Sequence, residues 1–446
     1  MTAPARPLPN IVYIHSHDTG RYIQPYGHAV PTPHLQALAE EGVLFRRAFC
    51  AAPTCSPSRA ALLTGQAPHS SGMLGLAHRG FSLNDYSQHI VHTLRRTGYT
   101  SALAGVQHVA RDPEMIGYDQ VLGKEDAEKL AIAWLESRPP QPFFLSVGFS
   151  ETHRRGRELG YFNPDGPAGD PRYCLPPAPL PDTPETRQDM ADFKVSAARL
   201  DKKMGEVFSC LERLGLAENT LIICTTDHGI AFPHMKCNLT DHGLGVFLIM
   251  KGPAPFRGGK VIDAMVSHID IFPTICDYLG LERPTWLQGA SILPLLAEGK
   301  GKGKEKGKGE GADTQKEIHE EIYAEVTYHA AYEPKRAVRT TRWKYIRNWD
   351  ERRRPVLPNC DRSLSKEVWL QNGWAGRPIP EEELYDLLFD PQERNNLAAA
   401  PEYAAVLADM RRRLTAWMER TNDPLLKGHV PMPEGARVND PDGIHP

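Results

Sequence analysis

The stretch that decides the fold is IVYI at 11–14, followed directly by HSHDTG at 15–20. A short unbroken run of β-branched and aromatic residues is typical of a buried strand, and polar turn-forming residues mark its end. Two other runs have the same form: FFLSVGF at 143–149 precedes SETHRR, and LIIC at 221–224 precedes TTDHG. Three predicted strands therefore end in clusters of His, Asp or Arg.

Helical patterns lie between these runs, and a fourth apolar run covers 246–250. The expected helices cover about 33–42, 87–98, 124–137, 188–215 and 267–280. Strands that alternate with helices predict an α/β fold, a doubly wound and mostly parallel sheet flanked by helices. Ligands of such sheets bind beyond the carboxyl ends of the strands. We therefore expect the three polar clusters to meet at one site.

A low-complexity segment divides the chain. Residues 299–317 are rich in glycine, lysine and glutamate, a composition typical of a solvated loop. We expect a catalytic α/β domain at 1–298 and a smaller α+β domain at 318–446. The second part contains strand-like runs at 320–326 and 336–347, the segment ELYDL at 383–387, and an amphipathic helix at about 401–420.

Composition restricts the class of protein. The 446 residues carry a net charge of −3, which gives no sign of a nucleic-acid partner. No window is long and apolar enough to span a membrane, and the N-terminal MTAPARP lacks the apolar segment of a secretory signal. The eight cysteines are scattered singly, without zinc-ribbon spacing. We expect a cytoplasmic protein with reduced thiols and no membrane partner; a homo-oligomer is compatible with the sequence.

The pentapeptide CSPSR at 55–59 joins a cysteine to an arginine four residues on. It leads into AALLTG at 60–65, a helical stretch closed by glycine. Unpaired N–H groups and the helix dipole make this start attractive to anions, and they should lower the pKa of the Cys55 thiol. The segment thus combines a nucleophile (Cys55), a helix start that can bind an anion, and a permanent positive charge (Arg59). Alone, the pattern would equally suit a cysteine that caps a buried helix.

The Cys-x-Pro-x-Arg pattern followed by LLTG resembles the signature of the type I sulfatases, which are formylglycine enzymes of the alkaline phosphatase superfamily. The resemblance covers nearly the whole chain, including TPHL at 32–35 and DHG at 227–229. EVT at 325–327 and GIAFP at 229–233 are most similar to the heparan N-sulfatase (sulfamidase) branch. The resemblance implies an alkaline-phosphatase-like fold and hydrolysis of a sulfate ester or sulfamate, with a sugar or other small molecule as substrate.

The resemblance also implies a role for each matched residue. A maturation enzyme would oxidise Cys55 to formylglycine (3-oxoalanine); one hydroxyl of its hydrate attacks sulfur and the other helps to expel sulfate. Arg59 would hold the hydrate and balance its charge. His108 would assist the elimination, and His153 would contact sulfate and the leaving group. Lys236 would be a second basic residue near the leaving oxygen.

One divalent metal ion would polarise the sulfate and the nucleophile. The implied ligands are His17, Asp18, Cys55, Asp227 and His228. The family ion is Ca²⁺, which suits oxygen-rich clusters. The family usually has an acidic pair after the first strand, and His17 stands at one of those positions. Two imidazole ligands shift the metal preference toward Mn²⁺ or Zn²⁺. The alternative is that His17 does not bind the metal.

A second departure concerns the substrate. Sulfatases usually carry a lysine two residues before the His108 position, where this chain has Val106. Loss of such a cation costs a few kcal/mol of transition-state stabilisation, unless Arg154, Arg155 or Lys236 compensates. Phosphonate and phosphodiester hydrolases of the superfamily also lack that lysine while using formylglycine. Two alternatives therefore stay open: a phosphodiester or phosphonate monoester hydrolase on the same fold, and a non-catalytic homologue.

Overall fold

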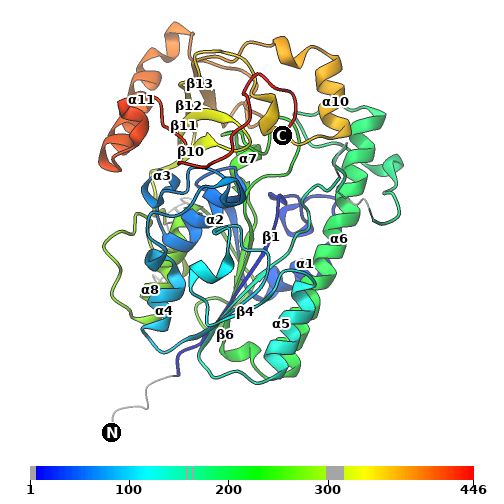
Figure 1. The fold of residues 1–446 in the computed structure, drawn as a ribbon, viewed down its shortest axis with the longest axis vertical. Coiled ribbons are helices and arrows are strands. Elements are labelled where there is room, and N and C mark those ends of the chain that lie inside the picture. The colour runs from blue at the N-terminus through cyan, green and yellow to red at the C-terminus, as the bar shows by residue number, and fades with distance from the viewer. Residues whose placement is uncertain (1–6, 157–158, 163–164, 298–315) are drawn as a thin grey trace, which may run out of the picture.

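The computed structural model describes residues 7–156, 159–162, 165–297 and 316–446. Within these residues the larger sheet has nine strands, in the order β4-β3-β5-β1-β6-β8-β2-β7, with β9 beside β2 (Figure 1). The strands are β1 Asn10–Ser16, β2 Val43–Phe49, β3 Thr100–Gly105, β4 Gln120–Gly123, β5 Phe143–Gly148, β6 Thr220–Thr226, β7 Gly245–Val246, β8 Leu248–Lys251 and β9 Lys260–Ser267.

The centre of this sheet is parallel, as the three apolar runs predict. β1 lies between β5 and β6, and Ile11 is in register with Phe144 on one side and Leu221 on the other. Every residue of these three strands is buried. The predicted strand at 246–250 is divided into β7 and β8, and β8 runs antiparallel to β6.

Helices cover both faces of the sheet, so the doubly wound α/β prediction is confirmed. α1 (Pro33–Glu41), α5 (Ala127–Glu136) and the long α6 (Pro184–Arg213) pack on one face (Figure 1). α2 (Cys55–Thr64), α4 (Ile90–Arg95) and α8 (Ile271–Leu279) cover the other. The short helices are α3 Pro68–Ser71, α7 Asp241–Leu244 and α9 Leu293–Leu296.

A second, antiparallel sheet of four strands lies in the C-terminal part, in the order β10-β11-β12-β13. These strands are β10 Glu321–Tyr328, β11 Tyr332–Thr340, β12 Trp343–Asn348 and β13 Glu382–Asp386; the helices here are α10 Leu364–Gln371 and α11 Ala404–Arg420. Leu407, Leu414 and Trp417 place the apolar side of α11 against this sheet. The α+β architecture is thus as expected, while the boundaries at 298 and 318 stay a prediction, because residues 298–315 lie outside the described residues.

Buried polar groups join the two sheets. The guanidinium of Arg336 lies 2.6 Å from Asp423 and 3.1 Å from Glu325, and Glu325 also accepts from His69 of α3 at 2.9 Å. The guanidinium neutralises carboxylates that would otherwise be unpaired in the interior. We therefore interpret this His/Glu/Asp cluster as a structural joint rather than a metal centre.

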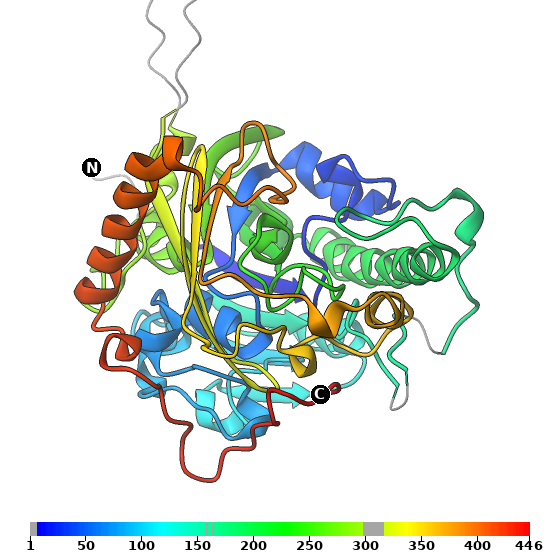
Figure 2. The same ribbon diagram turned by 90° about the horizontal axis from the view of Figure 1, so that it is seen from above.

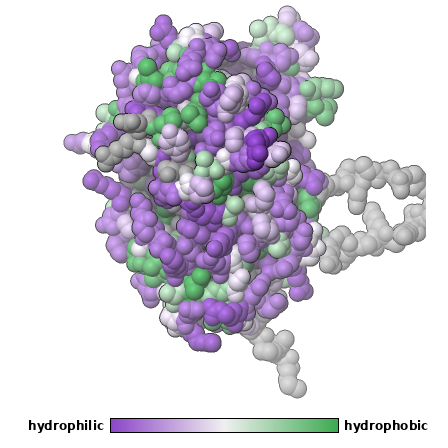
Figure 3. All heavy atoms as spheres, turned by 90° about the vertical axis from the view of Figure 1, so that its right-hand side faces the viewer, coloured by the Kyte–Doolittle hydropathy of each residue, from purple (hydrophilic) through white to green (hydrophobic). Residues whose placement is uncertain are grey.

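The outer surface is mixed. Figure 3 shows the face formed by α6 and α10 as mostly hydrophilic, with apolar residues scattered among polar ones. Among the described helices, none combines the length and apolarity needed to cross a bilayer.

Candidate active site and metal centre

The structure brings together all five predicted metal ligands. His17 and Asp18 follow β1, Asp227 and His228 follow β6, and Cys55 is the first residue of α2. One ligand atom of each residue lies within 4.8 Å of the others, and all five side chains are buried. Adjacent parallel strands end at the same edge of the sheet, which explains why the residues meet.

The distances define a small polar centre. The Cys55 Sγ atom lies 3.4 Å from His228 Nε2 and 3.9 Å from His17 Nδ1. Asp18 Oδ1 lies 2.8 Å from His17 Nδ1 and 3.2 Å from His228 Nε2, and Asp227 Oδ2 lies 3.2 Å from His17 Nδ1. Two carboxylates, two imidazoles and a sulfur that converge on one point fit a divalent cation.

A sharp turn after β1 aims Asp18 into this centre. Asp18 adopts a left-handed backbone with φ of 58°, which non-glycine residues rarely take. Its N–H donates to Asp227 Oδ1 at 2.8 Å, and the His17 N–H donates to the Glu151 carbonyl at 2.9 Å. The surrounding hydrogen bonds therefore hold an unfavourable conformation in place, as is common at functional sites.

Arg59 lies behind the centre and is 1% exposed. Its Nη2 donates to Asp227 Oδ2 at 2.9 Å and to the Ser16 carbonyl at 3.0 Å, while Nη1 donates to His15 Nδ1. Burial alone would raise the pKa of Asp227, but His228, Arg59 and His17 together hold it well below its usual range. His15 is thus the third acceptor that fixes Arg59.

The expectation of a lowered thiol pKa at Cys55 is wrong. Cys55 does begin α2 as predicted, but it is 3% exposed. Burial raises the pKa of the thiol well above its usual range; Lys236 and Arg59 oppose the rise, while Asp18 and Asp227 add to it. Desolvation of the thiolate outweighs the helix dipole, which a sequence pattern cannot weigh.

The predicted catalytic residues surround the outer side of the centre. His108 Nδ1 lies 3.3 Å from His17 Nε2, and the ring centroids of His153 and His17 are 4.4 Å apart. The His153 side chain is 35% exposed, so this side of the centre reaches solvent. The Lys236 ammonium donates to Asp18 Oδ2 at 2.8 Å.

The sequence gives no signal for one neighbour of Lys236. Lys236 also donates to Asp361 Oδ2 at 2.8 Å, and Asp361 comes from the C-terminal part of the chain. His329 is also buried, and its pKa is lowered first by burial and then by Lys236. Asp361 lies in no recognisable motif, so only the tertiary structure could identify it.

Val106 stands where sulfatases usually carry a lysine. In the described residues, neither Arg154 nor Arg155 contacts a candidate metal ligand in its place. Arg154 is committed elsewhere: its guanidinium forms two hydrogen bonds with Asp189, at 2.6 and 2.9 Å, and lies over the Phe162 ring. Arg155 pairs with Asp165 at 3.7 Å. Of the three candidates, Lys236 alone contacts the centre. Val106 lines a cavity of about 400 Å³ together with residues that include Lys124, Arg155 and Lys203, and none of the five candidate metal ligands lines this cavity.

Comparison with known proteins agrees with this geometry. The family model described as Sulfatase matches residues 9–130 and 117–281, and that of N-sulphoglucosamine sulphohydrolase, C-terminal, matches 234–357. N-sulphoglucosamine sulphohydrolase of Homo sapiens is 29% identical over 455 residues, which cover 89% of this chain and 87% of that protein.

Two solved structures share the fold. A 2-O GAG sulfatase superposes with a TM-score of 0.71 at 20% identity, covering 97% of this chain and 98% of that chain. A protein in complex with its substrate D-glucosamine-2-N,6-O-disulfate gives a TM-score of 0.68 at 19% identity, covering 93% and 98%. Together with the family model, which spans more than half of the chain, these findings show that the chain belongs to the sulfatase family of sulfuric ester hydrolases.

Proposed function

We propose that this protein is a metal-dependent sulfatase that uses a formylglycine derived from Cys55 and cleaves a sulfate ester or sulfamate on a saccharide. One observation carries the proposal: Cys55 starts α2, and its Sγ atom lies within 3.9 Å of both imidazoles of the candidate metal centre. For the substrate we favour an N-sulfated amino sugar. The match to the N-sulphoglucosamine sulphohydrolase C-terminal model and the human relative of that name support this choice.

The metal ion would be held by Asp18, Asp227, His17, His228 and the modified residue 55. When bound, it supplies a positive charge that polarises sulfate oxygens and stabilises the deprotonated nucleophile. Ca²⁺ is the expectation from the family. The two imidazole donors argue instead for Mn²⁺ or Zn²⁺, because softer nitrogen ligands suit those ions better.

The hydrated aldehyde would supply two hydroxyl groups on one carbon, one to attack sulfur and one to lose its proton as sulfate departs. Arg59 holds this group at the helix start and is itself fixed by Asp227, Ser16 and His15. In this proposal His108 takes the proton when sulfate leaves. His153, on the exposed side, protonates the leaving oxygen or nitrogen.

A second candidate activity is hydrolysis of a phosphodiester or phosphonate monoester by the same site. The observation that favours it is Val106, because Arg154 pairs with Asp189 and Arg155 with Asp165, and neither contacts a candidate metal ligand in the described residues. Lys236 is also shared with Asp361, which reduces the positive charge offered to sulfate. For either reaction, the further partner is a maturation enzyme that oxidises Cys55.

The proposal is tested with purified protein produced together with a formylglycine-generating enzyme. Peptide mass spectrometry reports the state of residue 55, and elemental analysis identifies the metal. Sulfate release from glucosamine N-sulfate is then compared with hydrolysis of an aryl phosphodiester. We expect faster sulfate release; a phosphodiester rate higher by orders of magnitude would establish the second candidate, and an unmodified thiol without metal would overturn both.

A further inference from the structure

Two arginines meet at the edge of the site without a counter-ion. Arg79 ends the 3₁₀ turn Ala77–Arg79, and Arg437 belongs to the C-terminal tail. The Arg437 N–H donates to the Arg79 carbonyl at 2.8 Å, and the Arg437 guanidinium donates to the His78 carbonyl at 3.4 Å. We call Arg79, Arg437 and His78 the arginine rim.

The rim is a built feature of the fold rather than two loose side chains. The Arg79 guanidinium donates to Asn439 Oδ1 at 2.7 Å and to the Ala330 carbonyl at 3.4 Å. The Asn439 N–H in turn donates to the Ala330 carbonyl at 2.8 Å. The tail is thus fixed between the segment around Arg79 and the turn after β10; Figure 2 shows the tail, in red, beside the blue and cyan segments.

The charges of the rim are not compensated. Within the described parts of the chain, neither guanidinium has a carboxylate partner, and the acceptors named above are neutral. Burial lowers the pKa of Arg79, and the positive charge of Arg437 lowers it further. The second contribution is the effect of a like charge nearby. Two cations placed together without an anion repel each other, and binding an anionic ligand would remove that cost.

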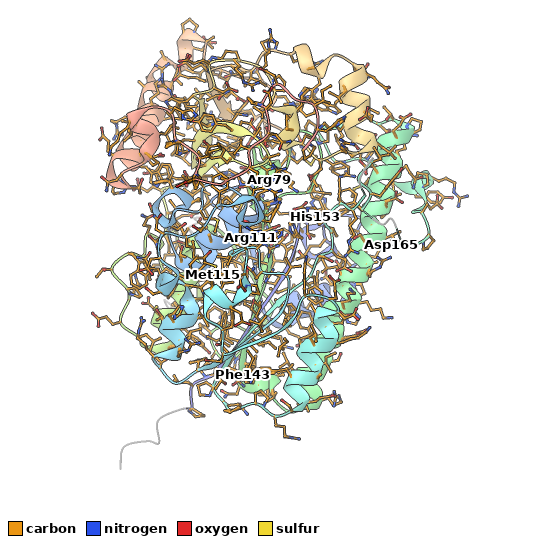
Figure 4. The ribbon with its side chains drawn as sticks, in the orientation of Figure 1. Arg79, Arg111, Met115, Phe143, His153 and Asp165 are labelled. Carbon is orange, nitrogen blue, oxygen red and sulfur yellow. The ribbon has the colours of Figure 1, made fainter. Side chains whose placement is uncertain are left out.

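The rim also lies next to the catalytic residues. The His78 ring is 5.6 Å from the His108 ring, and the His108 ring is 5.1 Å from that of His17. After burial, Arg79 and Arg437 are the main causes that lower the pKa of His78, and His153 and Lys236 act in the same direction. Figure 4 places both Arg79 and His153 where the C-terminal part meets the larger sheet.

We propose that the arginine rim binds a second anionic group of the saccharide substrate, a carboxylate or sulfate on the part of the sugar next to the group that is cleaved. This inference rests on the proposed saccharide sulfatase function. Guanidinium groups match carboxylate and sulfate oxygens in a bidentate geometry, so a pair of them selects for such a group. His78 links this subsite to His108, and the enzyme therefore prefers saccharides with at least two anionic groups.

The test measures binding by titration calorimetry in a Cys55→Ala background, which prevents turnover. Two of the ligands carry two anionic groups: glucosamine N-sulfate that is also 6-O-sulfated, and the disaccharide of glucosamine N-sulfate with a hexuronate. The other two carry one anionic group: glucosamine N-sulfate itself, and the same disaccharide after its carboxyl group has been reduced. Arg437→Gln and Arg79→Gln should each weaken binding of a doubly anionic ligand about tenfold. Binding of glucosamine N-sulfate should stay unchanged, and high salt should reduce the difference.

Arg412→Gln is the matched control, because Arg412 is an exposed arginine of α11 and its loss changes net charge equally. A preference for the hexuronate disaccharide or the disulfate identifies the group bound. Equal weakening of singly and doubly anionic ligands would overturn the proposal, as would a Cys55→Ala parent protein that binds them equally or binds neither. Sulfate release by the enzyme with an intact Cys55 reports separately on the proposed function. Arg437 lies on an exposed part of the tail, so Arg437→Gln is the variant that tests the rim if Arg79→Gln fails to fold.

Discussion

Asp361 accepts a hydrogen bond from Lys236 at 2.8 Å, and this contact joins the C-terminal part of the chain to the candidate metal centre. The same ammonium lies 2.8 Å from Asp18, a candidate metal ligand. Lys236 therefore bridges two carboxylates, and only part of its charge is available to a sulfate group. The C-terminal part thus sets the electrostatic balance of a site that the larger sheet builds.

Asp361→Asn should make the site more attractive to sulfate. The amide oxygen can still accept from Lys236, but the negative charge is gone, so the field at the sulfate position becomes more positive. We expect inhibition by inorganic sulfate to strengthen about three- to tenfold, measured as the inhibition constant in the hydrolysis assay. Asp442→Asn, which changes an exposed acid paired with Arg352, is the control. Unchanged inhibition in Asp361→Asn would show that this carboxylate does not tune Lys236.

Cys55→Ala should abolish turnover with little loss of stability. Alanine fills nearly the same space and keeps the start of α2, so only the nucleophile and one candidate ligand are removed. Cys224→Ala is the matched control, since Cys224 is an equally buried thiol in β6. Sulfate release and thermal midpoint are measured for both variants. Sulfate release by Cys55→Ala at the rate of the wild-type protein would exclude formylglycine chemistry.

Asp227→Asn should reduce both metal content and stability. Asp227 is the charged partner of Arg59 in an interior where both are buried, and breaking such a pair costs about 3–5 kcal/mol. Elemental analysis should find less metal per chain, and the thermal midpoint should fall. Asp241→Asn also breaks a buried ion pair, with Lys344 and Arg339, but lies in a separate network. If both variants retained metal equally, Asp227 would not be a ligand.

Much of the architecture could be predicted from the sequence because the decisive strands are uninterrupted apolar runs. The sequence predicts β1, β5 and β6 as strands. It does not predict β3 (TSALAG), because β3 consists mainly of small residues, which indicate a strand only weakly. β2 was missed for another reason: Arg46 and Arg47 interrupt its apolar pattern, and Arg46 faces solvent, where it pairs with Asp263. Such strands are defined by their neighbours in the sheet.

The site was foreseeable to the extent that it follows strand ends. His17, Asp18, Asp227 and His228 each come directly after a central strand, so parallel pairing alone brings them together. Asp361 has no such signal. It lies in an irregular segment between β12 and α10, and its place beside Lys236 depends on how the C-terminal part packs. The arginine rim likewise depends on the path of the tail.

Val106→Lys should raise sulfatase activity relative to phosphodiester hydrolysis. Val106 lines a cavity of about 400 Å³ at the ends of β3 and β5, so a lysine side chain has room to extend. A cation that reaches the transferred group stabilises its charge and is worth a few kcal/mol at most. We expect about a tenfold increase in kcat/KM for a sulfate substrate. Val121→Lys, a partly buried position in β4, is the control for the charge alone. An increase for both substrate classes would instead indicate a general electrostatic effect.

Acid should destabilise the protein through histidines that are buried in the neutral form, and His89 offers the clearest case. Burial lowers the pKa of His89 to about 3, with a smaller effect of His92. Between about pH 6.5 and 3 the unfolded chain binds a proton that the folded chain does not, so the free energy of unfolding falls as the pH falls. The contribution is about 1.4 kcal/mol per pH unit for each such group.

His89→Asn isolates this contribution. The ring Nδ1 accepts from the Val91 N–H at 3.2 Å at the start of α4, and the asparagine side-chain oxygen can replace it as a cap. Urea unfolding at pH 7.5 and pH 5 should show that the variant loses roughly 2 kcal/mol less than the wild type over that interval. His429→Asn is the control, because His429 is an exposed histidine of the C-terminal tail. An equal loss in His89→Asn and wild type would mean that His89 is protonated in the folded state or that other groups govern acid unfolding.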